Sequence, residues 1–207
     1  VEMEFKRYKY IHCPTNVGIA EAQNNGLNYL TGQGCRFGVI FDQDSQIRTD
    51  FVCKLAEHME VCNQNNNAIV IGPQIVCSYT RKARKPRVQK NLRVIEKNIH
   101  FVSQIIASGM FIDLDKLKIV GGKKEDLFID AVDHEWCWRA KEKGFDIAIA
   151  RNVEMVHQQG DKKRNFLGFE YRVSSPIRLY YQYRNVLLLR NESHVPPYWL
   201  YRNLVAM

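Results

Sequence analysis

Apolar residues recur along the chain with two different spacings, which predict alternating helices and strands. Segments 16–34 and 49–62 place apolar side chains every three or four residues, as an amphipathic helix does. Continuous apolar runs at 37–41 and 68–76 predict buried strands, the second broken by Gly72-Pro73. Helix, strand, helix and strand joined by short connections predict an α/β domain with a parallel sheet.

Two carboxylates follow the first of these strands directly. The run Val39-Ile40-Phe41 leads into Asp42, Gln43 and Asp44. In α/β sheets, ligands bind beyond the carboxyl ends of strands, so both acids are expected to line a crevice. Paired carboxylates suit a hard divalent cation such as Mg²⁺ or Mn²⁺. A simple capped turn is the alternative, because one D-x-D pattern is weak evidence alone.

A further helix is predicted in the segment 125–149. Val132, Trp136 and Ala140 share one helical face, Gly144 ends the helix, and the strand 145–150 follows. Asp133 lies in the first turn, where the helix dipole favours a carboxylate, and it is either a candidate base or a helix cap. Glu135 is placed to pair with Arg139 four residues on.

Length and composition fit one globular domain with an appendage. The chain has 207 residues, of which 45% are hydrophobic, and no apolar run approaches the roughly 18 residues that a membrane span requires. Its six cysteines include no C-x-x-C pair, which predicts free thiols in a reducing compartment.

The net charge of +8 is concentrated in one stretch. Residues 81–97 hold eight Lys or Arg against the single Glu96. This run is either a solvated loop or a basic flap that faces phosphates of a nucleotide, a lipid headgroup or a nucleic acid.

Five segments together carry a family resemblance. The chain resembles the family 2 inverting glycosyltransferases of the GT-A fold, most closely a rhamnosyltransferase-like branch. The segments are "NVGIAEAQNNGL" (16–27), "VIFDQDS" (39–45), "IIASGMFID" (105–113), "FIDAVDHEWCWRAKEKGF" (128–145) and "YYQYRNVLLL" (180–189). The resemblance implies a GT-A-like mixed sheet flanked by helices. It also implies inverting, metal-assisted transfer of a sugar, plausibly rhamnose, from a nucleoside diphosphate sugar to a cell-surface polysaccharide or its lipid-linked precursor.

The resemblance also assigns roles at matching positions. Asp133 takes the place of the catalytic base, and Asp42, Asp44 and His157 take the places of ligands to Mg²⁺ or Mn²⁺. The remaining roles form three groups. The residues expected to bind the donor are Asp42, Asn16, Gly18, Gln23 and Asn24. The residues expected to bind the acceptor are Ser108, Gly109, Glu135 and Trp136, with Trp136 or Trp138 as a platform for the sugar ring. The residues expected to contact phosphate or an anionic membrane are Arg178, Arg184, Arg81, Lys82 and Arg84.

The first predicted helix begins only about 15 residues into the chain, which leaves room for one strand before it. We therefore expect the first nucleotide-binding strands of the family to be missing. The expected division is a glycosyltransferase domain at 1–172 and a helical segment at 173–207. We expect a cytoplasmic location, with peripheral contact at the inner face of the plasma membrane left open.

Two alternatives belong to other classes. A phosphotransferase of the haloacid dehalogenase type would use Asp42 as a nucleophile, but such enzymes normally open with that strand. A non-enzymatic nucleic-acid-binding module would rest on the 81–97 run, which lacks the interleaved aromatic residues that a stacking platform needs. We therefore expect no nucleic-acid partner.

Overall fold

A computed structural model gives the structure of the protein and describes residues 8–43, 45–77, 93–96, 98–157, 163–166, 169–172 and 175–205. The helices are α1 (Gly18–Gly32), α2 (Phe51–Asn65), α3 (Leu114–Val120), the short 3-10 helix η1 (Glu125–Leu127), α4 (Val132–Glu142), α5 (Pro176–Leu189) and α6 (Pro197–Val205). The strands are β1 (Phe37–Ile40), β2 (Ala68–Cys77), β3 (Val94–Glu96), β4 (Ile99–Val102), β5 (Met110–Asp113), β6 (Asp146–His157), β7 (Lys163–Phe166) and β8 (Phe169–Arg172).

Six strands form one mixed sheet in the order β1-β5-β2-β6-β4-β3. Among the strands of the described residues, only β2 and β6 pair in parallel, whereas β5 is antiparallel to both β1 and β2 and lies between them. The expectation of a mixed sheet is therefore confirmed, and that of a wholly parallel one is wrong. The four-residue strand β5 is the reason, because it separates the two strands that the helix–strand alternation suggested as neighbours.

Strand β2 is not broken at Gly72-Pro73 as the sequence suggested. It continues to Cys77, and the pairing with β6 shifts register between Pro73 and Gln74. A bulge of this kind accommodates a proline, which has no N–H to offer the ladder.

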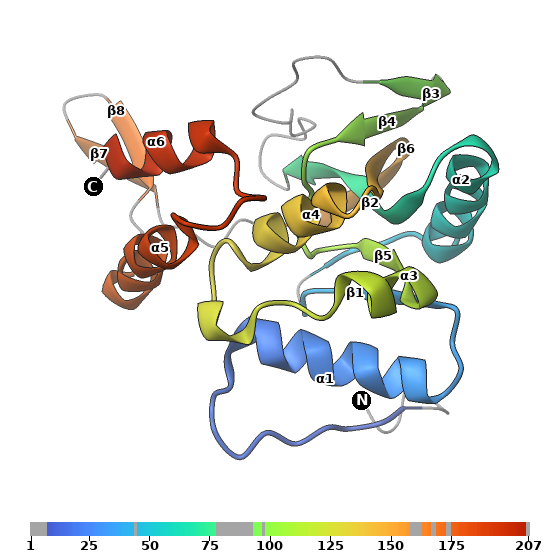
Figure 1. Ribbon diagram of the computed structural model, residues 1–207, viewed down its shortest axis with the longest axis horizontal. Coiled ribbons are helices and arrows are strands. Elements are labelled where there is room, and N and C mark those ends of the chain that lie inside the picture. Colours follow the sequence, from blue (N-terminus) through green and yellow to red (C-terminus); the bar gives the residue numbers. More distant parts are fainter. Residues whose placement is uncertain are drawn as a thin grey trace.

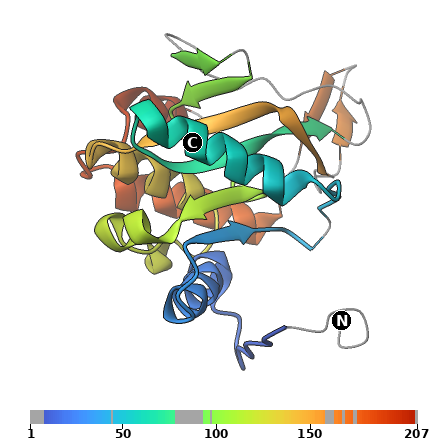
Figure 2. The same ribbon diagram turned by 90° about the vertical axis from the view of Figure 1, so that its right-hand side faces the viewer.

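Helices cover both faces of the sheet (Figures 1 and 2). On one face α2 buries Phe51, Leu55, Met59 and Cys62, the four residues that the helical spacing selected. On the other face α1, α3 and α4 pack their apolar side chains against β2, β5 and β6. The strands alternate accordingly, since Met110 and Ile112 of β5 point to the second face and Phe111 to the first.

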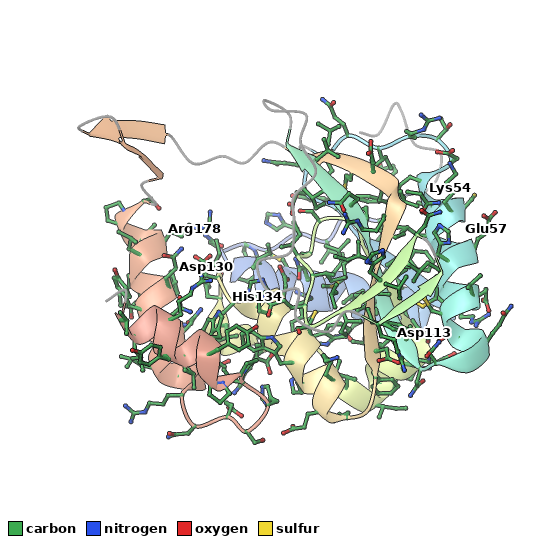
Figure 3. The ribbon with its side chains drawn as sticks, turned by 90° about the horizontal axis from the view of Figure 1, so that it is seen from above. Lys54, Glu57, Asp113, Asp130, His134 and Arg178 are labelled. Atoms are coloured by element: carbon green, nitrogen blue, oxygen red, sulfur yellow. The ribbon has the colours of Figure 1, made fainter. Side chains whose placement is uncertain are left out.

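The carboxyl-terminal helices lie at the opposite end of the molecule from α2 (Figures 1 and 3). A third apolar cluster joins them to the domain through Leu189 and Val195, which pack with Ala20 of α1 and Val132 and Trp138 of α4. Within the described residues, no helix has the length and apolar character that a membrane crossing needs. The division of the chain at residue 172 stays a prediction.

Candidate active site

The first acid, Asp42, lies just beyond the end of β1 and is tied to the start of β5. The backbone N–H of Gly109 donates to the carbonyl of Ile40 at 2.8 Å, which fixes the turn before β5 against the end of β1. The buried Ser108 hydroxyl donates to Asp42 Oδ2. The half-buried carboxylate is therefore held at the carboxyl end of the strand, as the sequence predicted.

This close approach depends on a glycine. Gly109 has φ +77°, and a Cβ at this position would lie 2.6 Å from Cγ of Pro73 and 3.2 Å from Sδ of Met155. A larger residue would push the turn away from β2 and β6, and Ser108 would lose its place beside Asp42.

The second acid, Asp133, reaches the same turn from the first turn of α4. Its Oδ2 accepts from the backbone N–H of Ala107 at 2.9 Å, and its Oδ1 lies 3.0 Å from Nζ of Lys123. The side chain keeps 23% of its surface exposed. Its partners belong to other segments, so Asp133 is not the cap of α4, and its role as the base stays a prediction. Asp42 and Asp133 thus contact adjacent residues of one turn.

Lys123 is a part of this site that the sequence did not reveal. Its ammonium is fully buried among Asp133, the Met110 sulfur at 3.6 Å and the Trp136 ring, whose centroid is 5.5 Å away. A buried ammonium is costly unless it is paired, and Asp133 is the pairing partner. The dipeptide Lys123-Lys124 follows two glycines and reads as an exposed turn, so no sequence pattern marked it.

Asn24 of α1 holds the backbone around Lys123. The Lys123 N–H donates to Asn24 Oδ1 at 2.7 Å, while Asn24 Nδ2 donates to the Lys123 carbonyl and to Glu125 Oε1. Asn24 is 6% exposed, and its amide is occupied within the protein. The assignment of Asn24 to donor binding is therefore corrected, because this side chain supports the segment that carries Lys123.

The turn before α4 has an unusual backbone, and α5 stabilises it. Phe128, Asp130 and Ala131 all have positive φ between 61° and 64°, a region that costs non-glycine residues free energy. The fully buried Asn185 donates through Nδ2 to three carbonyls of this turn, those of Leu127, Ile129 and Asp130. The "YRN" segment of α5 therefore sets the direction in which α4 and Asp133 begin.

Two arginines of α5 serve the same turn. Arg178 forms an ion pair with Asp130, with a 3.1 Å contact between Nε and Oδ2, and the two side chains lie together in Figure 3. Arg184 donates to the Asp126 carbonyl and lies over the Tyr181 ring at 4.7 Å. Both guanidinium groups bind the protein itself, and their assignment to an anionic phosphate or membrane stays a prediction.

The segment that carries His157 lies beside the D-x-D turn. Ser45 N–H closes the turn on the Asp42 carbonyl at 3.1 Å, and Gln46 forms an isolated antiparallel bridge with Val156. Gln46 N–H donates to Val156 O at 3.3 Å and Val156 N–H to Gln46 O at 3.2 Å. Asp44 and the side chain of His157 lie outside the described residues. Their neighbours bring the two backbone segments together, as a shared cation site requires.

A groove runs along α1 to Asp42 on the donor side predicted from the sequence. Gln23, Gly26 and Tyr29 of α1 line it together with Asp42 and the end of β1. Gln23 Oε1 is buried and has no hydrogen-bond partner within the part of the chain that the structure describes. An unpaired buried acceptor is costly, so Gln23 stays a candidate for donor binding.

The start of α1 has a structural task. Asn16 is exposed, and its Oδ1 accepts from the Gly18 N–H at 3.1 Å. Gly18 has φ +79°, and a Cβ there would lie 2.5 Å from Cδ2 of Phe128. The contact of Gly18 with Phe128 attaches α1 to the turn before α4, and the assignment of Asn16 and Gly18 to donor binding stays a prediction.

Comparison with known proteins identifies the chain. Residues 2–116, more than half of the sequence, match the family described as Glycosyl transferase family 2. The chain belongs to glycosyl transferase family 2. Over 192 residues it is 36% identical to the dTDP-rhamnosyl transferase RfbF of Shigella flexneri. That alignment covers 87% of this chain and 62% of the relative, so the chain spans less than two thirds of the relative's length.

Solved structures show that the fold of this family 2 chain is that of GT-A glycosyltransferases. GalNAc-T7 with UDP, GalNAc and Mn²⁺ matches with a TM-score of 0.53 at 12% identity, over 84% of this chain and 35% of that one. S. aureus TarS matches with a TM-score of 0.54 at 13% identity, over 93% of this chain and 31% of that one. S. aureus TarS 1–349 in complex with UDP-GlcNAc matches with a TM-score of 0.51 at 12% identity, over 92% of this chain and 52% of that one. The family supports neither the phosphotransferase nor the nucleic-acid-binding alternative.

Two acceptor assignments are wrong in this family 2 domain. Glu135 is fully buried and takes a two-point contact from Arg139, with Nε–Oε1 at 2.7 Å and Nη2–Oε2 at 3.1 Å. His194 approaches the same carboxylate at 3.0 Å. Trp136 is also fully buried and donates through Nε1 to the Gly121 carbonyl. The predicted pairing of Glu135 with Arg139 is confirmed, but neither Glu135 nor Trp136 has a surface that a sugar could contact.

Ser108 and Gly109, the other two predicted acceptor residues, do form the turn between the two acids. Trp138 keeps 3% of its surface and is no sugar platform either. Arg81, Lys82 and Arg84 lie outside the described residues. At the described end of the basic run, Arg93 pairs with Asp146 at 3.0 Å and lies over the Phe101 ring at 4.4 Å.

Proposed function

We propose that the chain is the core of an inverting glycosyltransferase that moves a 6-deoxyhexose, rhamnose first of all, from a nucleoside diphosphate to an acceptor hydroxyl. The observation that carries this proposal is the meeting of Asp42 and Asp133 on the turn at Ala107-Ser108. Displacement at an anomeric carbon needs a base on one side of the sugar and stabilisation of the leaving diphosphate on the other. The two acids approach the turn from different elements, as such a site requires.

Asp133 is the general base in this reaction. Its carboxylate takes the proton of the acceptor hydroxyl while the hydroxyl oxygen bonds to the anomeric carbon. The bond from that carbon to the diphosphate oxygen breaks at the same time, and the electron pair leaves with the diphosphate from the opposite face. Lys123 Nζ and the Ala107 N–H bind one carboxylate oxygen each, so they fix the orientation of the base toward the sugar.

The residues of the D-x-D turn fit a divalent cation. Asp42, Asp44 and His157 would supply two carboxylates and an imidazole, a set that suits Mn²⁺ and, through its oxygens, Mg²⁺. Ser45 Oγ, in the same turn, is buried without a hydrogen-bond partner among the described residues, which fits a polar ligand nearby. When bound, such an ion would neutralise negative charge on the leaving diphosphate. No three His, Cys, Asp or Glu side chains converge within the described ranges, which exclude the Asp44 and His157 side chains.

The proposed donor and acceptor rest on the relative and on the sequence. RfbF carries the name of a dTDP-rhamnosyl transferase, which favours a dTDP-linked 6-deoxyhexose as donor. The acceptor is a saccharide, either a growing cell-surface polysaccharide or its lipid-linked precursor. We propose a cytoplasmic enzyme whose 81–97 run, with its eight basic residues, contacts an anionic membrane at its surface.

Calorimetry with a panel of nucleoside diphosphate sugars, with and without Mn²⁺, tests the proposal. We expect dTDP-rhamnose to bind more tightly than the corresponding UDP-hexoses, and EDTA to weaken binding until Mn²⁺ is restored. Failure of every nucleoside diphosphate sugar to bind would contradict the proposed function. Binding that is indifferent to EDTA would contradict only the assignment of Asp42, Asp44 and His157 as metal ligands.

A further inference from the structure

A cavity of about 160 Å³ lies between the sheet and the carboxyl-terminal helix α6. The second half of β2 and the segment 102–108 form its inner wall, and Tyr198, Trp199 and Arg202 of α6 form its outer wall. His134 also lines the cavity, and Figure 3 shows this residue on the side of α4 that is nearer to α5 and α6. The cavity is separate from the groove along α1 that the donor is proposed to occupy.

Two residues of the cavity lining are next in sequence to groups at the proposed base. His134 lines it and directly follows Asp133 in the sequence. Ser108 also lines it and directly follows Ala107, whose N–H donates to Asp133 Oδ2. The cavity therefore reaches residues adjacent to the proposed base and to its hydrogen-bond partner, while the side chain of Asp133 is not among those that line it.

The lining combines an aromatic surface with polar side chains, as sugar-binding sites do. Trp199 and Tyr198 offer ring surface to the apolar C–H face of a pyranose. Gln74, Gln104 and Arg202 lie around it and carry amide and guanidinium groups that match sugar hydroxyls. Since Trp136 and Trp138 are buried, Trp199 is the tryptophan that reaches this cavity.

The Trp199 ring is held in place before any ligand arrives. It packs edge-on against Trp138, with 5.1 Å between ring centroids and an angle of 65°. Trp138 is fixed in turn by its Nε1, which donates to Gln104 Oε1 at 2.7 Å. A preorganised ring loses little freedom on binding, which favours a specific site.

Size argues for one sugar ring. Sites for drug-sized ligands occupy roughly 300–1,000 Å³, so a nucleoside diphosphate is too large for a cavity of about 160 Å³. A single pyranose is of the right scale for this cavity.

We propose that this cavity binds the terminal sugar of the acceptor, with the Trp199 ring as its platform and Tyr198 and Arg202 as specificity-determining residues. The proposal rests on the proposed glycosyl transfer and identifies which part of the molecule selects the acceptor. The residues proposed to select the acceptor lie on α6, outside residues 2–116 that match the family.

Saturation-transfer NMR with methyl glycosides of hexoses, 6-deoxyhexoses and N-acetylhexosamines tests the cavity directly on the full chain. The variants are Trp199→Ala, Trp199→Phe and Tyr198→Ala, with Tyr201→Ala as the matched control. Tyr201 is 73% exposed on the same helix and does not line the cavity. Trp199→Ala removes the ring that packs on Trp138 and can therefore disturb the fold. Trp199→Phe keeps an aromatic ring at this position and Tyr198→Ala leaves Trp199 in place, so these two variants test the cavity even if Trp199→Ala does not fold. Circular dichroism of each variant checks that it is folded.

We expect at least one glycoside to bind the wild type and Tyr201→Ala equally, and Trp199→Ala to weaken it by about tenfold or more. Trp199→Phe should restore most of the binding, and Tyr198→Ala should weaken it less. Equal binding by all folded variants, or no glycoside binding to a wild type that binds the nucleoside diphosphate sugar, would overturn the cavity assignment. Failure of the donor to bind by calorimetry would instead overturn the proposed function.

Discussion

Asp42 and Asp133, which are 91 positions apart in the sequence, are held by adjacent residues of one turn. Ser108 donates its hydroxyl to Asp42, and Ala107 donates its N–H to Asp133. The turn itself is fixed by Gly109, whose N–H donates to Ile40 at the end of β1. A displacement of this short segment would move the two carboxylates relative to each other, so the turn sets the geometry of the whole site.

Replacement of Asp133 by Asn should abolish most of the transfer activity and leave donor binding intact. The amide is similar in shape to the carboxylate but cannot accept the acceptor proton at neutral pH, and general-base catalysis contributes roughly 10²–10⁴-fold to a rate. Initial rates of glycosyl transfer and calorimetry of the donor measure the two effects. Asp115→Asn is the matched control, because Asp115 also lies in the first turn of a helix but is 71% exposed. Turnover retained by Asp133→Asn would remove Asp133 from the role of base.

Replacement of Lys123 by Met should lower kcat and leave the donor dissociation constant nearly unchanged. Asp133 would lose the ammonium that binds its Oδ1, and one partner of a buried pair would be removed. Such a change costs roughly 3–5 kcal/mol in a fully buried pair. We expect about 2–3 kcal/mol in the free energy of unfolding, since water can reach the 23% of Asp133 that is exposed.

Lys124→Met serves as the control for this change, and urea denaturation measures both variants. Lys124 pairs with Glu192 across side chains that are 33% and 35% exposed. Pairs of that kind contribute about 0–1 kcal/mol. Equal losses in the free energy of unfolding for the two variants would show that the buried Lys123–Asp133 pair contributes no more to stability than the exposed Lys124–Glu192 pair.

The helices α1, α2 and α4 and the longer strands could be predicted from the sequence because periodicity reports burial, whereas α3 was not predicted. The spacing of Phe51, Leu55, Met59 and Cys62 identified the buried face of α2, and the apolar run before Asp42 identified the edge at which the site lies. The strand β5 was missed because four buried residues after a loop carry no period of their own. Its antiparallel insertion changed the expected sheet from parallel to mixed.

Polar residues that act across long sequence separations could not be predicted in the same way. In the sequence, Lys123 and Asn185 look like ordinary surface residues. In the structure, Lys123 binds Asp133, and Asn185 donates hydrogen bonds to three carbonyls of a turn that lies 55 to 58 residues away in the sequence. Trp136 and Trp199 illustrate the same limit. Both are tryptophans in helices, and only the packing of α4 against the sheet decides that Trp136 is sealed while Trp199 reaches a cavity.

Replacement of Asn185 by Asp should unfold or strongly destabilise the domain. The new oxygen would face the carbonyls of Leu127, Ile129 and Asp130, which now receive hydrogen bonds from Nδ2. Each buried acceptor left without a donor costs about 1–3 kcal/mol, so we expect a loss of at least about 3 kcal/mol in thermal or urea denaturation. Asn203→Asp is the control, because Asn203 makes a single side-chain hydrogen bond within the described part of the chain, to Trp199 of its own helix. This variant should change stability by less than about 1 kcal/mol. Similar losses for both variants would contradict the role of Asn185 in the turn before α4.

Cys137 should make the stability of the domain fall at high pH. Burial between α4 and the sheet raises the pKa of its thiol to about 12. An unfolded thiol ionises near pH 8.5–9, so above that pH the unfolded chain binds fewer protons than the folded one. Stability is therefore unaffected below about pH 8.5 and declines between about pH 9 and 12.

By pH 10.5 this thiol alone should reduce the free energy of unfolding by about 2 kcal/mol relative to pH 7. Urea denaturation across this range should show a smaller decline for Cys137→Ala, because the variant has no thiol to ionise when it unfolds. Cys53→Ala removes an exposed thiol and should keep the wild-type decline. Only the change with pH is compared, since Cys137→Ala also leaves a small void that lowers stability at every pH. Parallel curves for the wild type and Cys137→Ala would show that the Cys137 thiol does not stay protonated in the folded domain.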